Sequence, residues 1–350
     1  MTGSTGLAAL VRRSIDHLDD RLERTLFDTG DPATVAAHLE RACTSTVGPP
    51  ARAFRYRAGV GIVAGLVLGD GREVIGKVHR WNISPDRLRA VRTVQAAVAN
   101  AGLPAPRPLG DIVECGAGLA AFEDHRPGGP ADGREPSVRR TIAAGLHDLV
   151  AAARPLVDEV DVGRQTITRP DGPLWPEPHD PRLDFDATSS GAEWIDELAL
   201  DARRRLASAG ADAPSVIGHA DWRVGNLGFA AERLVAIYDW DSVTAAPEAV
   251  IVGLTAAQFG IDWGAGEDDP VPTIPEMAAF VADYEDVRGT RFTLSEWELV
   301  DAANLALISY GARCQHSDVT LRPGIGAGAD TRWLRALTER RSVALRPGRA

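Results

Sequence analysis

The stretch His219-Ala-Asp-Trp-Arg-Val-Gly-Asn226, with the apolar segment after it, decides the fold of this 350-residue chain. Its carboxylate, Asp221, is followed five positions later by the amide of Asn226. A second carboxylate, Asp239, stands thirteen positions further on, behind the apolar run Leu234 to Ile237. This spacing suits a loop that supplies a base and one metal ligand, and a strand that returns a second ligand to the same point. Phosphoryl transfer needs such groups, because its transition state is stabilised mainly by positioning and charge neutralisation.

These residues resemble the catalytic loop and metal-binding strand of the aminoglycoside phosphotransferase and choline kinase family, which is similar in fold to protein kinases. That family carries a His-x-Asp-x-x-x-x-Asn loop, matched here by His219, Asp221 and Asn226. It also carries an Ile-Asp-Trp/Phe-Asp/Glu strand, matched by the segment 238–241 with Tyr in place of Ile. A lone Asp-x-x-x-x-Asn is more often a turn, since both residues hydrogen-bond their own backbone. The two patterns in this order favour a site.

The resemblance implies a role for each residue. Asp221 is expected to orient the acceptor hydroxyl and take its proton, and Asn226 and Asp239 to bind Mg2+ through oxygen. His219 is expected to brace the loop and not to act as a base. Asp241 is a second candidate beside the metal, or a cap for the next segment of the chain. Arg223 is a candidate phosphate or substrate contact, with an exposed loop arginine as the preferred alternative.

Composition and charge limit the classes of protein. The chain is 44% hydrophobic and 25% charged, which is typical of a soluble globular protein. Its net charge of -11 argues against nucleic-acid binding and permits a cationic substrate. Three distant cysteines without a CxxC spacing predict neither disulfides nor zinc. Without a signal-peptide pattern or an 18-residue apolar run, we expect no membrane association and a cytoplasmic location.

Periodicity along the chain predicts strands and helices, and the resemblance implies that they form an α+β fold with the two lobes of a protein kinase. Helical spacing in residues 5–45 predicts two helices, so 1–50 forms a region that docks on the first lobe. Residues 51–124 form that lobe, and 125–350 form a mainly helical second lobe. The first lobe is expected to hold a five-stranded antiparallel sheet with strands at 53–57, 61–68, 73–79, 112–115 and 118–122. Helices are expected at 86–100, 137–153, 192–209, 274–284, 294–314 and 331–345.

Lys77 is the only lysine in the sequence, and it lies on the third expected strand. Kinase-like folds place a lysine there against the α- and β-phosphates of ATP. A compact ammonium suits phosphate oxygens, although a solvated strand residue is the alternative. Gly59 and Gly61, in the turn before the second strand, would let backbone N–H groups approach the phosphates, or simply form a turn.

The resemblance implies that the backbone of Phe122, Glu123 and Asp124 connects the two lobes and bonds the adenine edge; an ordinary linker fits the same residues. Two departures from the family stand beside it. The helix at 86–100 lacks the glutamate that normally pairs with the strand lysine, since no carboxylate lies near Val91. The segment 245–251 lacks the aspartate that normally braces the catalytic loop. The acidic partner of Lys77 therefore stays unassigned.

Two segments are candidates for the acceptor site. Residues 162–190 are rich in Pro, Gly and Asp and predict an irregular insertion. Asp262, Trp263 and Glu267 belong to an acidic stretch that could bind an amine-rich acceptor, although a solvated loop is the favoured alternative.

Together these patterns predict an ATP- and Mg2+-dependent O-phosphotransferase. Its acceptor is a hydroxyl of a small molecule, with an aminoglycoside or another antibiotic as candidates. An amino alcohol or sugar kinase is an alternative. The two departures from the family also leave open a nucleotide-binding pseudokinase without turnover. The acceptor, the choice between ATP and GTP, and the oligomeric state are not determined by the sequence.

Overall fold

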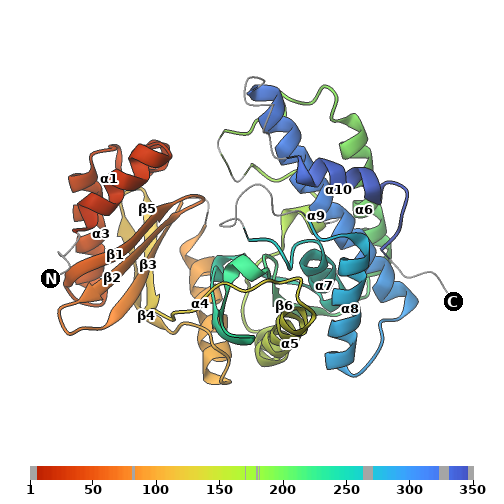
Figure 1. The fold of residues 1–350 in the computed structure, drawn as a ribbon, viewed down its shortest axis with the longest axis horizontal. Coiled ribbons are helices and arrows are strands. Elements are labelled where there is room, and N and C mark those ends of the chain that lie inside the picture. Colours follow the sequence, from red (N-terminus) through yellow and green to blue (C-terminus); the bar gives the residue numbers. More distant parts are fainter. Residues whose placement is uncertain are drawn as a thin grey trace. The chain divides into compact units, whose positions relative to one another are not determined.

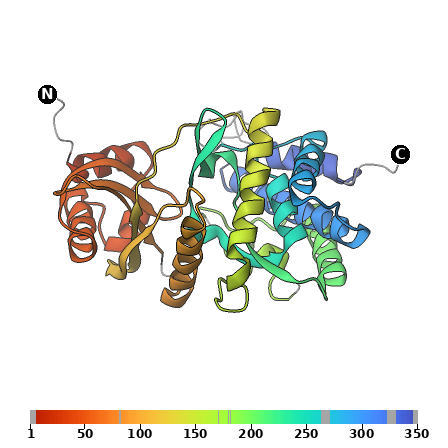
Figure 2. The same ribbon diagram turned by 90° about the horizontal axis from the view of Figure 1, so that it is seen from below.

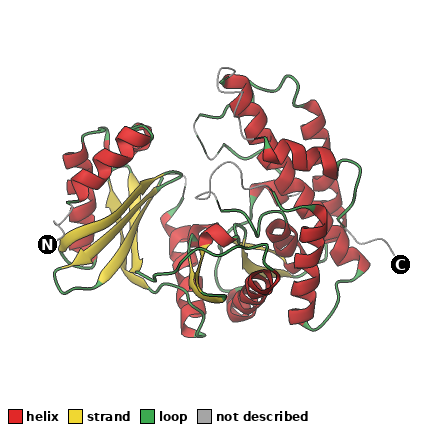
Figure 3. Cartoon of the chain, viewed as in Figure 1, coloured by secondary structure: helices red, strands yellow, loops and turns green. Residues whose placement is uncertain are grey.

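The computed structural model describes residues 6–80, 83–169, 171–178, 180, 182–262, 271–322 and 331–345. The chain divides into two compact units (Figure 1). The first comprises the described residues up to 100 together with 105–127, and the second comprises 101–104 and the described residues from 128 onward. The first unit is built around a β-sheet, whereas helices dominate the second (Figure 3).

Five strands form the sheet of the first unit, in the spatial order β1-β2-β3-β5-β4 with every neighbouring pair antiparallel. Their bounds are β1 Pro50–Ala58, β2 Ile62–Leu68, β3 Glu73–His79, β4 Pro108–Cys115 and β5 Gly118–Asp124. The expected five-stranded antiparallel sheet is therefore confirmed. The turn between β2 and β3 uses Gly71 at a φ of 88°, a left-handed conformation that favours glycine.

One face of this sheet is covered by the N-terminal segment. Side chains alternate between the two faces of a strand, and Ile62, Val74 and Phe122 belong to one core cluster with the N-terminal helices. The prediction of two helices was wrong, because there are three: α1 Leu7–His17, α2 Arg21–Phe27 and α3 Pro32–Thr46. The new helix expected to begin at Asp31-Pro32 is α3, and the unexpected break lies between α1 and α2, where Leu18 has a φ of -108° and a ψ of -85° that do not continue a helix.

The other face of the sheet carries Lys77 and the helix α4 Pro85–Asn100. Figures 1 and 2 show α1 and α3 on one side of the sheet and α4 on the other. The hydrogen bonds from Gln95 to Glu123 and from Arg92 to the carbonyl of Leu109 attach α4 to strands β5 and β4. Side-chain hydrogen bonds thus contribute to the attachment of α4 to the sheet.

The second unit is mainly helical, as expected. Its helices are α5 Pro136–Ala153, α6 Glu193–Gly210, α7 Glu248–Ala256, α8 Ile274–Arg288, α9 Leu294–Leu321 and α10 Arg332–Arg340. Two small antiparallel ribbons pair β6 Ser215–His219 with β9 Val243–Pro247, and β7 Leu227–Ala230 with β8 Arg233–Ile237. Among the described residues, no helix is both long and apolar enough to cross a membrane.

Candidate active site

The loop after β6 brings the first two predicted functional groups together. Nδ2 of Asn226 donates to Oδ2 of Asp221 at 2.7 Å and to the backbone carbonyl of Asp221 at 2.9 Å. The other carboxylate oxygen, Oδ1, accepts from Nε of Arg223 at 2.9 Å. Both oxygens of Asp221 are therefore held in place by donors. Because the amide nitrogen of Asn226 is used in this way, its oxygen Oδ1 is the atom left for a cation.

The ribbon β7–β8 returns the chain to Asn226. The backbone N–H of Tyr238 donates to the carbonyl of Asn226 at 2.9 Å, which places Asp239 beside the loop. Asp239 adopts a left-handed backbone conformation with φ 61° and ψ 48°. For a residue other than glycine this conformation costs about 1–3 kcal/mol, and such strain gathers at functional sites. Oγ of Ser242 donates to Oδ2 of Asp239 at 3.3 Å.

The buried side chain of His219 contacts the segment that carries Asp239. Its side chain is fully buried, and Nε2 donates to the carbonyl of Tyr238 at 3.0 Å. Burial lowers the pKa of His219 despite the negative charges of Asp221 and Asp239, so the imidazole is neutral at neutral pH. The bond joins the end of β6 to the residue that precedes Asp239. A buried ring bonded to a carbonyl is poorly suited to remove a proton from a substrate, and the role of His219 as a brace stays a prediction.

Arg223 differs from the preferred expectation of an exposed loop arginine. Its side chain is only 11% exposed and forms an ion pair with Asp221 at 2.9 Å. The correction has a physical reason: Asp221 stands two residues away, and its carboxylate can accept the guanidinium as soon as the loop is formed. Arg223 therefore acts on the orientation of Asp221.

Two further residues support the loop and were missed from the sequence. Nε2 of Gln258, just after α7, donates to the carbonyl of Ala220 at 2.7 Å. Nε1 of the buried Trp222 donates to the carbonyl of Ile142 in α5 at 2.9 Å. The segment 245–251 lacks the bracing aspartate, as the sequence already showed, and Gln258 supplies a bond to the loop from a position shortly after this segment.

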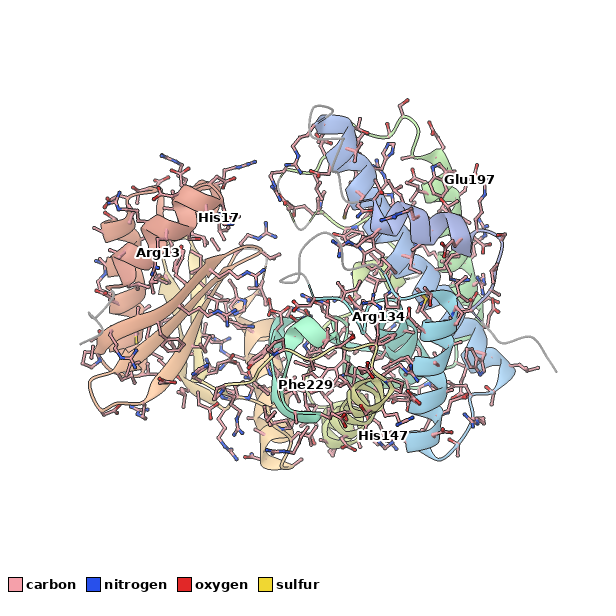
Figure 4. The ribbon with its side chains drawn as sticks, viewed as in Figure 1. Arg13, His17, Arg134, His147, Glu197 and Phe229 are labelled. Atoms are coloured by element: carbon pink, nitrogen blue, oxygen red, sulfur yellow. The ribbon has the colours of Figure 1, made fainter. Side chains whose placement is uncertain are left out.

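The ribbon β7–β8 is anchored to the segment that precedes α5. Phe229, labelled in Figure 4, exchanges two backbone hydrogen bonds with Gly129, at 2.8 and 2.9 Å. At the neighbouring Gly128, a Cβ atom would lie 2.5 Å from Cα of Gly228, so this close approach requires glycine. Strand β7 is thereby fixed to the segment 128–129, which limits the movement of Asn226 directly before it.

In the first unit, Lys77 lies on β3 directly opposite Val63 on one side and Ala121 on the other. Gly59 and Gly61 form the turn between β1 and β2, where the N–H of Gly59 donates to the carbonyl of Gly61 at 3.0 Å. A Cβ atom on Gly61 would lie 2.7 Å from the carbonyl oxygen of Val78, so this glycine is needed for close packing of the turn.

Phe122, Glu123 and Asp124 form the last part of β5. The N–H of Asp124 donates to the carbonyl of Arg107 at 3.0 Å, and Phe122 and Glu123 pair with β3 and β4. The side chain of Phe122 is buried among the N-terminal helices. Contacts between the backbone of this segment and an adenine base stay a prediction.

The family is decided by comparison with known proteins. A model of the phosphotransferase enzyme family matches residues 66–299, which is more than half of the chain. The chain belongs to this family. The matched residues include the lysine of β3, the loop of Asp221 and Asn226, and the segment around Asp239. The chain is thus a phosphotransferase, as the sequence predicted.

Solved structures show the same fold at low sequence identity. One is an amicoumacin kinase in complex with AMP-PNP and Ca2+, with a TM-score of 0.62 and 12% identity over 84% of this chain and 89% of that one. Another is a thermostable mutant of an aminoglycoside phosphotransferase, with a TM-score of 0.53 and 16% identity over 87% and 100%. A macrolide 2'-phosphotransferase from Brachybacterium faecium gives 0.50 and 14% over 86% and 97%. A search of the curated proteins found no match.

The described residues of this phosphotransferase contain no cluster of three His, Cys, Asp or Glu side chains that would hold a metal by itself. Asn226 and Asp239 each carry an oxygen that can bind a cation, and the backbone bond from Tyr238 to Asn226 joins their two segments. Such a pair suits Mg2+, which keeps several water ligands and is commonly bound through one or two carboxylates together with phosphates. The residues therefore fit the predicted cation.

The candidate acceptor residues are only partly described. Trp263 and Glu267 lie outside the described residues. Asp262 lies beside the catalytic loop, because a Cβ atom on Gly225 would meet both Oδ1 of Asp262, at 3.0 Å, and the guanidinium of Arg223.

The irregular insertion at 162–190 contains one short 3₁₀ turn, Thr166–Thr168, within its described residues. It is held against α9 by the buried Arg313, which donates to Oγ1 of Thr188 at 3.1 Å and lies over the ring of Phe185 at 4.9 Å. The insertion is thus packed onto the helical unit in this part, and its role in acceptor binding stays a prediction.

Proposed function

We propose that the chain transfers the γ-phosphoryl group of ATP, with Mg2+, to a hydroxyl group of a small molecule, and that antibiotics are the first acceptors to test. The observation that carries this proposal is the contact of Asp221 with Asn226, to which the backbone of Tyr238 is bonded in turn. This contact, together with the bond that joins the residue before Asp239 to the same loop, supports a site with a carboxylate and two oxygen ligands, as phosphoryl transfer requires.

Asp221 orients the acceptor hydroxyl and takes up its proton. Its side chain is 30% exposed, so a substrate can reach it. A carboxylate has about four lone-pair positions. Asn226 and Arg223 use one position on each oxygen, and the others are available to a hydroxyl group. The two donors fix the carboxylate in one orientation, which lowers the entropy lost when the acceptor binds.

Asn226 and Asp239 hold Mg2+ in this proposal, and the cation would neutralise charge on the phosphates. The role of the protein is to fix the two ligands. His219 bonds to Tyr238, the residue before Asp239. In the ribbon β7–β8, Leu227, the residue after Asn226, pairs with Ile237. Lys77 binds phosphate oxygens through its ammonium group, for which the turn at Gly59 and Gly61 supplies backbone N–H groups.

The choice of acceptor rests on the related structures. The three proteins named above are kinases or phosphotransferases of amicoumacin, aminoglycosides and macrolides. Identities of 12–16% support the class of acceptor and no single compound. The net charge of -11 and the position of Asp262 beside the loop favour an acceptor with amino groups.

The test is Mg2+-dependent consumption of ATP across a panel of aminoglycosides, macrolides, other antibiotics, amino alcohols and sugars. Asp221→Asn keeps the shape of the side chain and removes the base. Asp148→Asn, on the exposed surface of α5, is the matched control. Turnover with one acceptor, lost in Asp221→Asn and kept in Asp148→Asn, supports the proposal. Nucleotide binding without turnover on any acceptor would favour a pseudokinase.

A further inference from the structure

A buried carboxylate shares a face of the sheet with Lys77. Strands β3 and β5 pair with Ile75 opposite Glu123 and Lys77 opposite Ala121, without a shift of register. Residues directly opposite each other project from the same face, as do residues two apart in one strand. Glu123 is therefore a diagonal neighbour of Lys77. Such neighbours lie about 7–8 Å apart, a distance that two long side chains can bridge.

Helix α4 contacts Glu123 on this face. Glu123 is 7% exposed and Gln95 of α4 is 3% exposed. Nε2 of Gln95 donates to Oε2 of Glu123 at 2.6 Å and to the carbonyl of Pro106 at 2.9 Å. Gln95 thus fixes the carboxylate but brings no positive charge. A buried carboxylate needs a cation or several hydrogen bonds to offset the loss of water.

Arg92 is a second cation near Glu123, but the hydrogen bonds of its Nη2 go to strand β4. Arg92 of α4 directs its Nη2 to two carbonyls of β4, at 3.1 and 2.5 Å. Burial lowers the pKa of Arg92, and the negative charge of Glu123 offsets part of that effect, so Glu123 also lies within the field of this arginine. Arg57 and His79 lie on the same face as Lys77, but neither carries a negative charge, so neither can be its acidic partner.

Two other acids on this face are poorly placed for Lys77. Glu73 lies four residues away on β3, and its carboxylate is bonded to Nδ1 of His125 at 2.9 Å. Glu114 lies opposite Leu119 on β4, at the far edge of the sheet, and is exposed. Glu123 is thus the acid nearest to Lys77 among the described residues of these strands.

We propose that Glu123 is the acidic partner of Lys77, and that Gln95 of α4 positions Glu123. In this arrangement the carboxylate comes from the sheet, where related enzymes take it from the helix. The ion pair would hold the ammonium group in one direction before the phosphates bind. The catalytic value of the pair rests on the proposed function, whereas the pair itself does not.

A test independent of activity uses the fact that Lys77 is the only lysine. The full chain is acylated at limiting reagent at pH 8.5, and the tryptic peptide Glu73 to Arg80 reports the modification of Lys77 by mass spectrometry. The N-terminal amine is the internal reference. Only the neutral amine reacts, so a fall of one unit in the pKa of Lys77 raises its rate about tenfold.

Four proteins are compared: the natural chain, Glu123→Gln, Glu114→Gln and Gln95→Leu. We expect Glu123→Gln to raise the rate of Lys77 about tenfold, because a nearby carboxylate stabilises the charged amine. Glu114→Gln removes an equal charge from the same face and leaves the rate unchanged. Gln95→Leu breaks the bond between α4 and β5 but keeps the carboxylate, so it raises the rate less than Glu123→Gln does.

A rate for Glu123→Gln within twofold of the natural chain would overturn the ion pair. An equal rise in Gln95→Leu and Glu123→Gln would overturn it as well, since Glu123 would then only attach α4 to the sheet. Turnover is measured on the same proteins, with a rise in KM for ATP or a fall in kcat expected in Glu123→Gln, a smaller change in Gln95→Leu and none in Glu114→Gln. Slow labelling of Lys77 in a chain that transfers no phosphate would count against the proposed function and leave the ion pair standing.

Discussion

Replacing His219 with Phe tests how the site is held in place. The phenyl ring fills nearly the same buried space, but it cannot donate to the carbonyl of Tyr238, which His219 contacts at 3.0 Å. A buried carbonyl left without its donor costs about 1–3 kcal/mol. We therefore expect His219→Phe to lower the free energy of unfolding by about 1–3 kcal/mol at pH 7.5.

The pH dependence of this difference gives a sharper test. Burial lowers the pKa of His219 in the folded chain below its ordinary value of about 6.5. Below pH 6.5 the unfolded chain binds a proton that the folded chain does not, so the stability of the natural chain falls with pH. The contribution of His219 is fully present above pH 6.5 and is lost as the pH falls toward the folded pKa. Each pH unit in that range removes up to about 1.4 kcal/mol of the contribution of His219, a loss that the natural chain suffers and His219→Phe does not.

The assay is urea unfolding followed by tryptophan fluorescence at pH 7.5, 6.5 and 5.5. The gap between the natural chain and His219→Phe should shrink as the pH falls. His219→Gln is the matched control, since it keeps a neutral donor and does not titrate. It should be more stable than His219→Phe at pH 7.5, and the difference in stability between these two variants should not change with pH. A gap that widens toward pH 5.5 would refute the reasoning, because it would mean that His219 is charged in the folded chain.

Three further changes test the support of the loop and the use of a cation. Gln258→Leu leaves the carbonyl of Ala220 without its donor and should lower the free energy of unfolding by about 1–3 kcal/mol, with a fall in kcat; unchanged urea unfolding would contradict the brace. Gly128→Ala should destabilise by about 1–3 kcal/mol because its Cβ would lie 2.5 Å from Cα of Gly228, whereas in Gly129→Ala the nearest atom is 3.5 Å away and little change is expected in a thermal melt. Chelation with EDTA should abolish turnover, and excess Mg2+ should restore it. The melting temperature of the nucleotide-free chain should not change, since two oxygen ligands do not make a structural metal site. An activity that resists the chelator would argue against a divalent cation.

The parts of this protein that the sequence could predict are those encoded by local patterns. Alternating apolar residues gave the strands of the five-stranded sheet, and the fixed spacing of Asp221 and Asn226 gave a loop in which the two side chains meet at 2.7 Å. A side chain five residues away in a tight loop is a neighbour whatever the rest of the chain does. The same holds for the turn at Gly71, where positive φ is needed.

The parts that could not be predicted depend on residues that are distant in the sequence. Gln258 reaches Ala220 across 38 residues, and Gln95 reaches Glu123 across 28. No periodicity marks such pairs, because a buried polar contact is fixed only when helices and strands are packed. The third N-terminal helix was missed for another reason: the break between α1 and α2, at Leu18, falls within a continuous apolar pattern and carries no Gly or Pro that would mark it.

The central claim is that Asp221 and Asn226 form the catalytic centre of a small-molecule phosphotransferase. Its most direct test is the kcat of Asp221→Asn with an acceptor that the natural chain phosphorylates, measured beside the Kd of the same variant for ATP. The account predicts a fall in kcat of about 10²–10⁴-fold, the usual contribution of a general base, with a Kd within about twofold. A kcat for Asp221→Asn equal to that of the natural chain would contradict it.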